Sequence, residues 1–174
     1  FWDELSCEKL RPEPVRAARA EEMTEVRKHG LYTKVPVEEV MRITGKKPIG
    51  TRWVDINKGD AANPEYRSRL VAKEIKLNKR EDLFAATPPL EAKKLLFSMA
   101  VTEWIGFRRG MRKNGMKLEF IDVRRAYFHS EVRRTLYVQL PHEDSEEGMC
   151  GLLRKAMYGT RDAAACWEAF YTDI

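Results

Sequence analysis

The segment at residues 117–129, Lys-Leu-Glu-Phe-Ile-Asp-Val-Arg-Arg-Ala-Tyr-Phe-His, constrains the fold more than any other stretch of the chain. It predicts an apolar strand that ends at Asp122 and passes at once into a short segment carrying Tyr127 and Phe128. A carboxylate at the end of a buried strand is costly unless a positive group meets it, and Mg²⁺ prefers carboxylate oxygen. The local pattern alone favours a plainer interpretation, in which Asp122 caps a helix that begins at Val123.

A β-hairpin is the second strong constraint. Residues 51–57 and 66–73 are rich in β-forming side chains and flank a loop, which is the pattern of two antiparallel strands. The period of two puts Arg67, Arg69 and Lys73 on one face of the second strand. Guanidinium groups match phosphate oxygens, so this row is suited to binding phosphates. A solvated outer face is the alternative, and it is the commoner one.

The clearest amphipathic helix is predicted between residues 91 and 104, with its apolar side toward a core. Its stripe consists of Ala92, Leu95, Leu96, Met99 and Ala100. The other expected elements are an irregular lead-in over 1–14, a helix over 15–28, a helical turn over 35–42, a loop over 78–89, strands over 135–140 and 149–155, and a final helix capped by Asp162 or Thr160.

The composition permits several classes of partner and argues against others. With 43% hydrophobic and 34% charged residues, the chain can bury a core and is not typical of disorder. A net charge of +5 permits a polyanionic partner such as nucleic acid without establishing one. A basic loop over residues 106–115 is as compatible with solvation as with a phosphate backbone. Three cysteines without a CxxC pair and scattered histidines argue against a disulfide framework or a zinc site. No apolar run reaches membrane-spanning length.

Four blocks of residues, taken in order, resemble the reverse transcriptase domain of copia-type long-terminal-repeat retrotransposons. The blocks are Gly50-Thr-Arg-Trp-Val-Asp-Ile56, Tyr66-Arg-Ser-Arg-Leu-Val-Ala-Lys73, Phe120-Ile-Asp-Val-Arg-Arg-Ala-Tyr-Phe128 and Leu153-Arg-Lys-Ala-Met-Tyr-Gly-Thr-Arg-Asp-Ala-Ala-Ala-Cys-Trp167. The second is similar to the family's fingers strand, and the third to its first catalytic motif, Leu-Asp-Val-x-x-Ala-Phe. The resemblance covers most of residues 20–174, and four blocks in order are much more specific than one.

This resemblance implies an α+β fold that holds the fingers and part of the palm of a right-hand polymerase. We expect a lead-in and helix over 1–30, a fingers-like region over 31–115 and the first part of the palm over 116–174. The resemblance further implies that Asp122 is a catalytic carboxylate that binds two Mg²⁺ ions, with Mn²⁺ as a substitute. The backbone carbonyl of Val123 would help to hold one ion. Such metals activate the primer hydroxyl and stabilise the leaving oxygens.

The same resemblance implies a set of nucleotide-binding residues. Arg67, Arg69 and Lys73 would clamp the triphosphate of an incoming dNTP. Tyr127 would lie beneath the deoxyribose and exclude a 2′-hydroxyl by its bulk. The remaining candidates are Phe128, which would pack beside Tyr127, and Arg161 and Asp162 in the fourth block.

The chain also departs from the family pattern. Asp162 stands where the family has Gln, and Ala164 and Ala165 stand where it has Pro and Arg. An Asp near the incoming phosphates is predicted to weaken their binding. The segment after Lys73 lacks the family's Gly-x-x-Gln run. The Tyr-x-Asp-Asp motif, which supplies further metal-binding carboxylates, would lie beyond Ile174, so the 174-residue piece is predicted to be inactive alone.

The leading hypothesis is an RNA-directed DNA polymerase segment of a retrotransposon Pol polyprotein. Its expected partners are template RNA or DNA, primer, dNTPs and the adjacent protease, integrase and ribonuclease H domains, with no membrane. A cytoplasmic particle followed by nuclear entry is expected from the family. A second hypothesis is a decayed or co-opted fragment that binds nucleic acid without catalysis. A third is a structural α+β domain in which Asp122 is only a helix cap.

Overall fold

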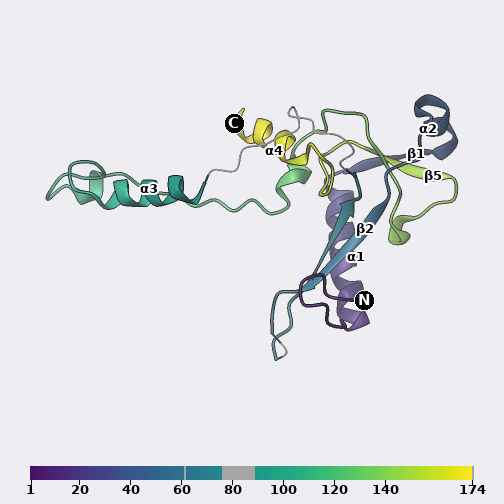
Figure 1. Cartoon of the computed structure of the whole chain (residues 1–174), viewed down its shortest axis with the longest axis horizontal. Helices are drawn as coiled ribbons and strands as arrows, with labels where there is room; N and C mark the ends of the chain where they lie inside the picture. Colours follow the sequence, from purple (N-terminus) through teal and green to yellow (C-terminus); the bar gives the residue numbers. More distant parts are fainter. Residues whose placement is uncertain (61, 76–88, 174) are drawn as a thin grey trace. The chain divides into compact units, whose positions relative to one another are not determined.

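The computed structural model describes residues 1–60, 62–75 and 89–173, without the side chain of Arg112 (Figure 1). Helices and antiparallel strands occur together, so the fold is mixed α and β. In chain order the elements, in which η marks a 3₁₀ turn, are α1 (Pro12–Lys28), β1 (Tyr32–Pro36), α2 (Val37–Thr44), β2 (Thr51–Asn57), β3 (Tyr66–Ala72), α3 (Leu90–Val101), η2 (Arg112–Asn114), η3 (Ala126–His129), β4 (Tyr137–Val138), η4 (His142–Asp144), β5 (Met149–Leu153) and α4 (Ala163–Thr172).

The chain divides into two compact units. The first comprises Phe1–Phe84 together with Arg125–Ile174, and the second comprises Ala85–Arg124. All of the described strands and three of the four described α-helices belong to the first unit. The second unit contains α3 and the segment that ends at Asp122.

The predicted hairpin is confirmed as β2 and β3, which pair antiparallel over seven residues each. The alternation expected for β3 is also present, because Ser68, Leu70 and Ala72 are buried while Arg67 and Arg69 are only partly buried. Helix α1 runs along this hairpin and packs against β3 (Figure 1). One face of β3 therefore supports the core, and the other presents cations.

A second sheet has the strand order β1-β5-β4, and all of its pairings are antiparallel. The helical turn predicted over 35–42 is confirmed as α2, although the helix begins at Val37 and ends at Thr44. Strand β1, which stays extended to Pro36 just before it, was not expected. The reason is tertiary, because β5 supplies the hydrogen-bonding partner that puts Tyr32 opposite Leu153. The predicted strand over 135–140 shortens to the two residues of β4.

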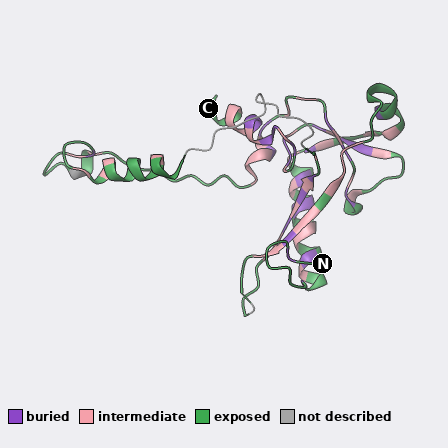
Figure 2. Cartoon of the chain, viewed as in Figure 1, coloured by how far each residue is buried: buried purple, intermediate pink, exposed green. Residues whose placement is uncertain are grey.

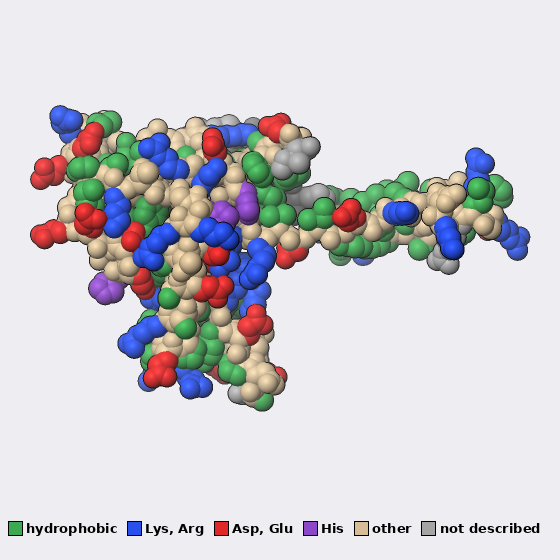
Figure 3. All heavy atoms as spheres, turned by 180° about the vertical axis from the view of Figure 1, so that it is seen from behind, with side chains coloured by type: hydrophobic (Ala, Val, Ile, Leu, Met, Phe, Trp, Pro, Cys, Tyr) green, Lys and Arg blue, Asp and Glu red, His purple; other side chains and the backbone are tan. Residues whose placement is uncertain are grey.

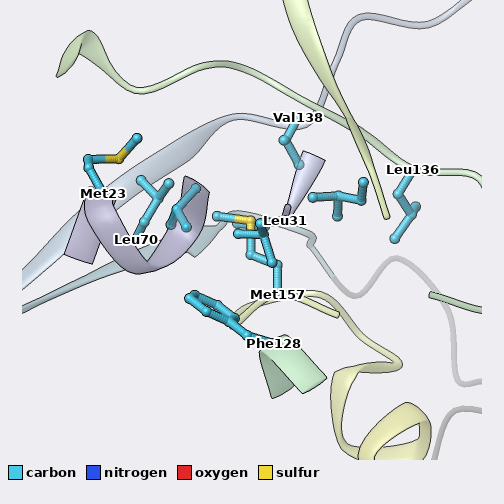
Figure 4. Close-up of a cluster of buried hydrophobic side chains, with 10 residues drawn as sticks. Met23, Leu31, Leu70, Phe128, Leu136, Val138 and Met157 are labelled. Atoms are coloured by element: carbon cyan, nitrogen blue, oxygen red, sulfur yellow. The ribbon is translucent and has the colours of Figure 1, made fainter. Parts of the chain in front are cut away.

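The core of the first unit is assembled from segments far apart in the sequence (Figure 4). Helix α1, strand β3 and turn η3 each contribute side chains, and Leu31 and Met157 lie near its centre. The labelled members are Met23, Leu31, Leu70, Phe128, Leu136, Val138 and Met157. This core fixes η3 and the segment before α4 relative to β3.

The lead-in predicted over residues 1–14 is too long. Helix α1 begins at Pro12 and includes Pro14, and this is allowed because a proline in the first helical turn forfeits an N–H that has no partner there. The residues before α1 are hydrogen-bonded to the hairpin. The amide of Asn57 donates to Oδ2 of Asp3 over 2.6 Å.

The second unit confirms the predicted helix but not its burial. Helix α3 spans Leu90–Val101, and none of its side chains is buried (Figure 2). The predicted strand over 117–122 is wrong, since the structure has no strand there and Phe120 is 76% exposed. A strand requires a hydrogen-bonding partner, and no described residue pairs with this segment. Most of the loop expected over 78–89 lies outside the described residues.

None of the helices in the described ranges has the length and apolar character needed to cross a bilayer.

Candidate functional site

The outer face of β3 carries two of the predicted triphosphate-binding cations. Arg67 and Arg69 are partly buried on this strand, and the guanidinium carbon of Arg69 lies 5.0 Å from the ring centre of Tyr158. Lys73 follows the strand with an exposed side chain, and its amide donates to the carbonyl of Gly50 over 2.8 Å. Arg67 and Arg69 thus share the less buried face of β3, and Lys73 follows the strand at the end away from the hairpin loop.

The Tyr158 ring contacts Arg69 on this face, and two rings from η3 pack beside Tyr158. The ring centres of Tyr127 and Tyr158 are 4.8 Å apart, and those of Phe128 and Tyr158 are 5.9 Å apart. Tyr127 is partly exposed, whereas Phe128 is 0% exposed and belongs to the core. Phe128 therefore packs into the core and anchors η3 there, and Tyr127 is the more exposed ring of this pair.

Tyr158 contacts both Arg69 and the aromatic ring of Tyr127, and the sequence predicted no role for it. Burial raises the pKa of the Tyr158 hydroxyl, and the positive charge of Arg69 offsets part of that rise. A guanidinium about 5 Å from a ring centre is within the range of a cation–π contact. The signal available in the sequence was its place in the fourth block, but nothing local indicates that it meets β3.

The turn that carries Tyr158 is packed tightly against the end of β3. The amide of Ala72 donates to the carbonyl of Tyr158 over 2.8 Å. Gly159 has a φ of +83°, and an added Cβ would collide with the carbonyl oxygen of Ala72 and with the Val71 side chain. Only glycine fits this left-handed position without strain. The approach of the turn to the strand thus depends on Gly159.

Asp162 is buried and fully engaged in the fold. Its side chain is 2% exposed, and both of its oxygens accept hydrogen bonds from Arg134 over 2.8 Å. Burial acts to raise the pKa of Asp162, but the hydrogen bonds and charge of Arg134 outweigh it, so the pKa is lowered. The negative charge of Asp162, which we expected to oppose incoming phosphates, is therefore paired with Arg134. Asp162 occupies the predicted N-cap position of α4, but its side chain makes no capping hydrogen bond.

Arg161 lies beside Asp162 and is partly exposed. Its backbone amide donates to Oε2 of Glu74 over 2.8 Å, which ties the fourth block to the segment following β3.

Asp122 and Val123 belong to the second unit, where both are exposed. The capping interpretation of Asp122 is wrong, since the next described helical element is η3, and Arg125 occupies its N-cap. Carboxylate and carbonyl oxygens are suitable donors for Mg²⁺. However, no group of three or more His, Cys, Asp or Glu side chains in the described ranges could hold a metal ion. The described residues alone thus do not complete a metal site.

The comparison with protein families decides what kind of chain this is. Residues 37–174 match the family described as "Reverse transcriptase (RNA-dependent DNA polymerase)". The chain belongs to the reverse transcriptase family. Reverse transcriptases generally use divalent metal ions, and the Asp122 block lies inside the matched region.

A curated relative of this reverse transcriptase chain is the "Retrovirus-related Pol polyprotein from transposon TNT 1-94" of Nicotiana tabacum. The two are 25% identical over 158 residues, which cover 86% of this chain and 11% of the relative. The resemblance to copia-type retrotransposons is thereby confirmed. The chain spans about a ninth of the relative's length. No solved structure matches it.

Proposed function

We propose that this chain is part of an RNA-directed DNA polymerase, encoded within the Pol polyprotein of a copia-type retrotransposon. The family match over residues 37–174 carries the proposal, because that region contains the block around Asp122. The proposed substrates are dNTPs and a primer annealed to an RNA or DNA template. Integrase and ribonuclease H are the proposed neighbouring domains. The proposed location is a cytoplasmic particle that later delivers its product to the nucleus.

Within this proposal the chain contributes the fingers, over 31–115, and the first part of the palm of a right-hand polymerase. The reaction joins the primer 3′-oxygen to the α-phosphorus of the dNTP and releases pyrophosphate. Arg67, Arg69 and Lys73 would neutralise the triphosphate, since the two arginines share one face of β3 and the exposed Lys73 directly follows the strand. Tyr127 would limit the room for a 2′-hydroxyl, and its contact with Tyr158 supports its ring.

The decisive test concerns Asp122 in the polymerase that carries this sequence. We expect Asp122→Asn to lower primer extension by roughly 10³-fold, because a metal-binding carboxylate supplies several kcal/mol of transition-state stabilisation. The measurement is incorporation of labelled dNTP on a primed RNA template, with Mg²⁺ and separately with Mn²⁺. The matched control is Glu119→Gln, an exposed carboxylate in the same segment, which should stay within about twofold. Undiminished synthesis by Asp122→Asn would overturn the proposed role of Asp122.

Residues 1–174 by themselves are proposed to be inactive. The reason is that residues 1–174 contain no Tyr-x-Asp-Asp motif, which supplies further metal-binding carboxylates in the family that the chain resembles. Magnesium-dependent primer extension by the isolated chain would contradict this.

Non-catalytic binding of nucleic acid is the second candidate function. The departures from the family pattern at Asp162 and Ala165 favour it, together with a net charge of +5. Cations are interspersed with acidic side chains on the face drawn in Figure 3, so binding would depend on local clusters rather than on a uniform field. If this candidate is right, affinity for RNA should fall steeply between about 50 and 200 mM salt. Binding that ignores salt would count against it.

A further inference from the structure

Arg134 bridges two carboxylates from distant segments of the first unit, Glu74 and Asp162. Its Nε and Nη2 donate to Asp162, each over 2.8 Å. Its Nη1 and Nη2 donate to Glu74 over 3.0 and 3.1 Å. One guanidinium thus holds two carboxylates through four N–H···O bonds. The hydrogen bonds to Asp162 are the main reason that the pKa of Arg134 is raised, so the guanidinium stays positively charged.

The network joins three segments that the sequence keeps far apart. Glu74 follows β3, Arg134 follows η3, and Asp162 precedes α4. Glu74 also accepts the backbone N–H of Arg161 over 2.8 Å. The turn at residues 158–162 is therefore fixed at both ends, at Tyr158 by the amide of Ala72 and at Arg161 by Glu74.

This turn determines how the candidate nucleotide-binding side chains meet. It carries Tyr158, whose ring lies under the Arg69 guanidinium and beside the Tyr127 ring. A shift of the turn relative to β3 would change both contacts together. Two bidentate carboxylate pairs on one planar guanidinium resist such a shift, because their geometry is directional.

We propose that Arg134 is a positioning residue of the nucleotide site. By holding Glu74 and Asp162 together, it sets the distance between the cationic face of β3 and the Tyr127–Tyr158 pair. Arg134 touches no reacting atom in this role, and its effect is on the fit of the incoming dNTP. This inference rests on the proposed polymerase function.

The test is steady-state primer extension by the polymerase that carries this sequence, with Arg134→Lys. Lysine keeps the positive charge but cannot form two bidentate pairs. We expect KM for dNTP to rise about tenfold while kcat stays within about twofold, the pattern of lost binding that is common to ground and transition states. A purely structural role would reduce the folded fraction, which lowers the apparent kcat and leaves KM unchanged.

Arg154→Lys is the matched control, an exposed arginine of the same unit that bonds Thr33, and its KM should not change. Should Arg134→Lys fail to fold, Asp162→Gln removes one charge while Arg134 stays paired with Glu74. Its KM should rise about threefold, because a neutral partner bonds a guanidinium less strongly than a carboxylate does. An unchanged KM in a folded variant, or a selective loss of kcat, would overturn the positioning role alone. A wild-type polymerase that extends no primer would overturn the proposed function and this role with it.

Discussion

The two units of the chain use similar sequence patterns with different results. In the first unit, apolar stripes on α1 and β3 meet other segments and form a connected core. In the second, α3 also carries an apolar stripe, yet the helix buries none of its side chains, and Leu95 is 61% exposed. Periodicity thus predicts that a helix forms and which side is apolar. It does not predict whether another segment covers that side.

The strands give the same contrast. β1 has a weak sequence signal but forms because β5 offers its backbone groups across the sheet. Residues 117–122 have a strong signal and remain without a partner among the described residues. A strand is therefore a property of a pair of segments, whereas a helix satisfies most of its own hydrogen bonds.

Two phenylalanines of the third block should show the largest difference between the units. Phe128→Ala removes a fully buried ring and should lower the free energy of unfolding by about 3–5 kcal/mol. Phe120→Ala removes an exposed ring that stacks on Phe97 of α3, and it should change the free energy of unfolding by about 1 kcal/mol or less. Urea unfolding followed by circular dichroism measures both. Equal losses would mean that the segment around Phe120 is packed as tightly as the core.

Two glycines in left-handed conformations test how tightly the Tyr158 turn packs on β3. Gly148→Ala, at φ +72° in open space, should cost about 1–2 kcal/mol from its backbone conformation alone. Gly159→Ala has the same backbone cost and also forces a collision with Ala72, which adds about 1–3 kcal/mol. Thermal unfolding of the two variants separates these contributions. Identical melting temperatures would show that the turn can move away from the strand freely.

The smallest expected effect is a pH dependence that comes from the buried charges of the first unit. The pKa of Asp162 is lowered in the fold from its usual value of 3.8. Its pairing with Arg134 should therefore stabilise the protein above about pH 4, and this contribution should disappear as the pH falls through the lowered pKa. Unfolding in urea between pH 5 and pH 2 measures the slope, which Asp162→Asn should reduce. Parallel curves for the wild type and the variant would contradict this.

Much of the candidate site could be predicted from the sequence because its signals are local. The alternation of side chains in β3 predicted that Arg67 and Arg69 share one face. In the third block, only the order of residues distinguished Tyr127 from Phe128, which lies in the core. The role of Tyr158 was missed, since its contacts with Arg69 and Tyr127 depend on segments that are distant in the chain.

The sequence by itself determined the family, the hairpin and most of the helices. These follow from residue order and from periods of two and 3.6 residues, which neighbouring side chains encode. Only the tertiary structure decided that β1 is a strand, that α3 buries none of its side chains, and that the charge of Asp162 is balanced by Arg134. Arg134 and Glu74 are 60 residues apart in the chain, so no local pattern could pair them. Arg134 also pairs with the buried Asp162, whose carboxylate without this partner would cost several kcal/mol.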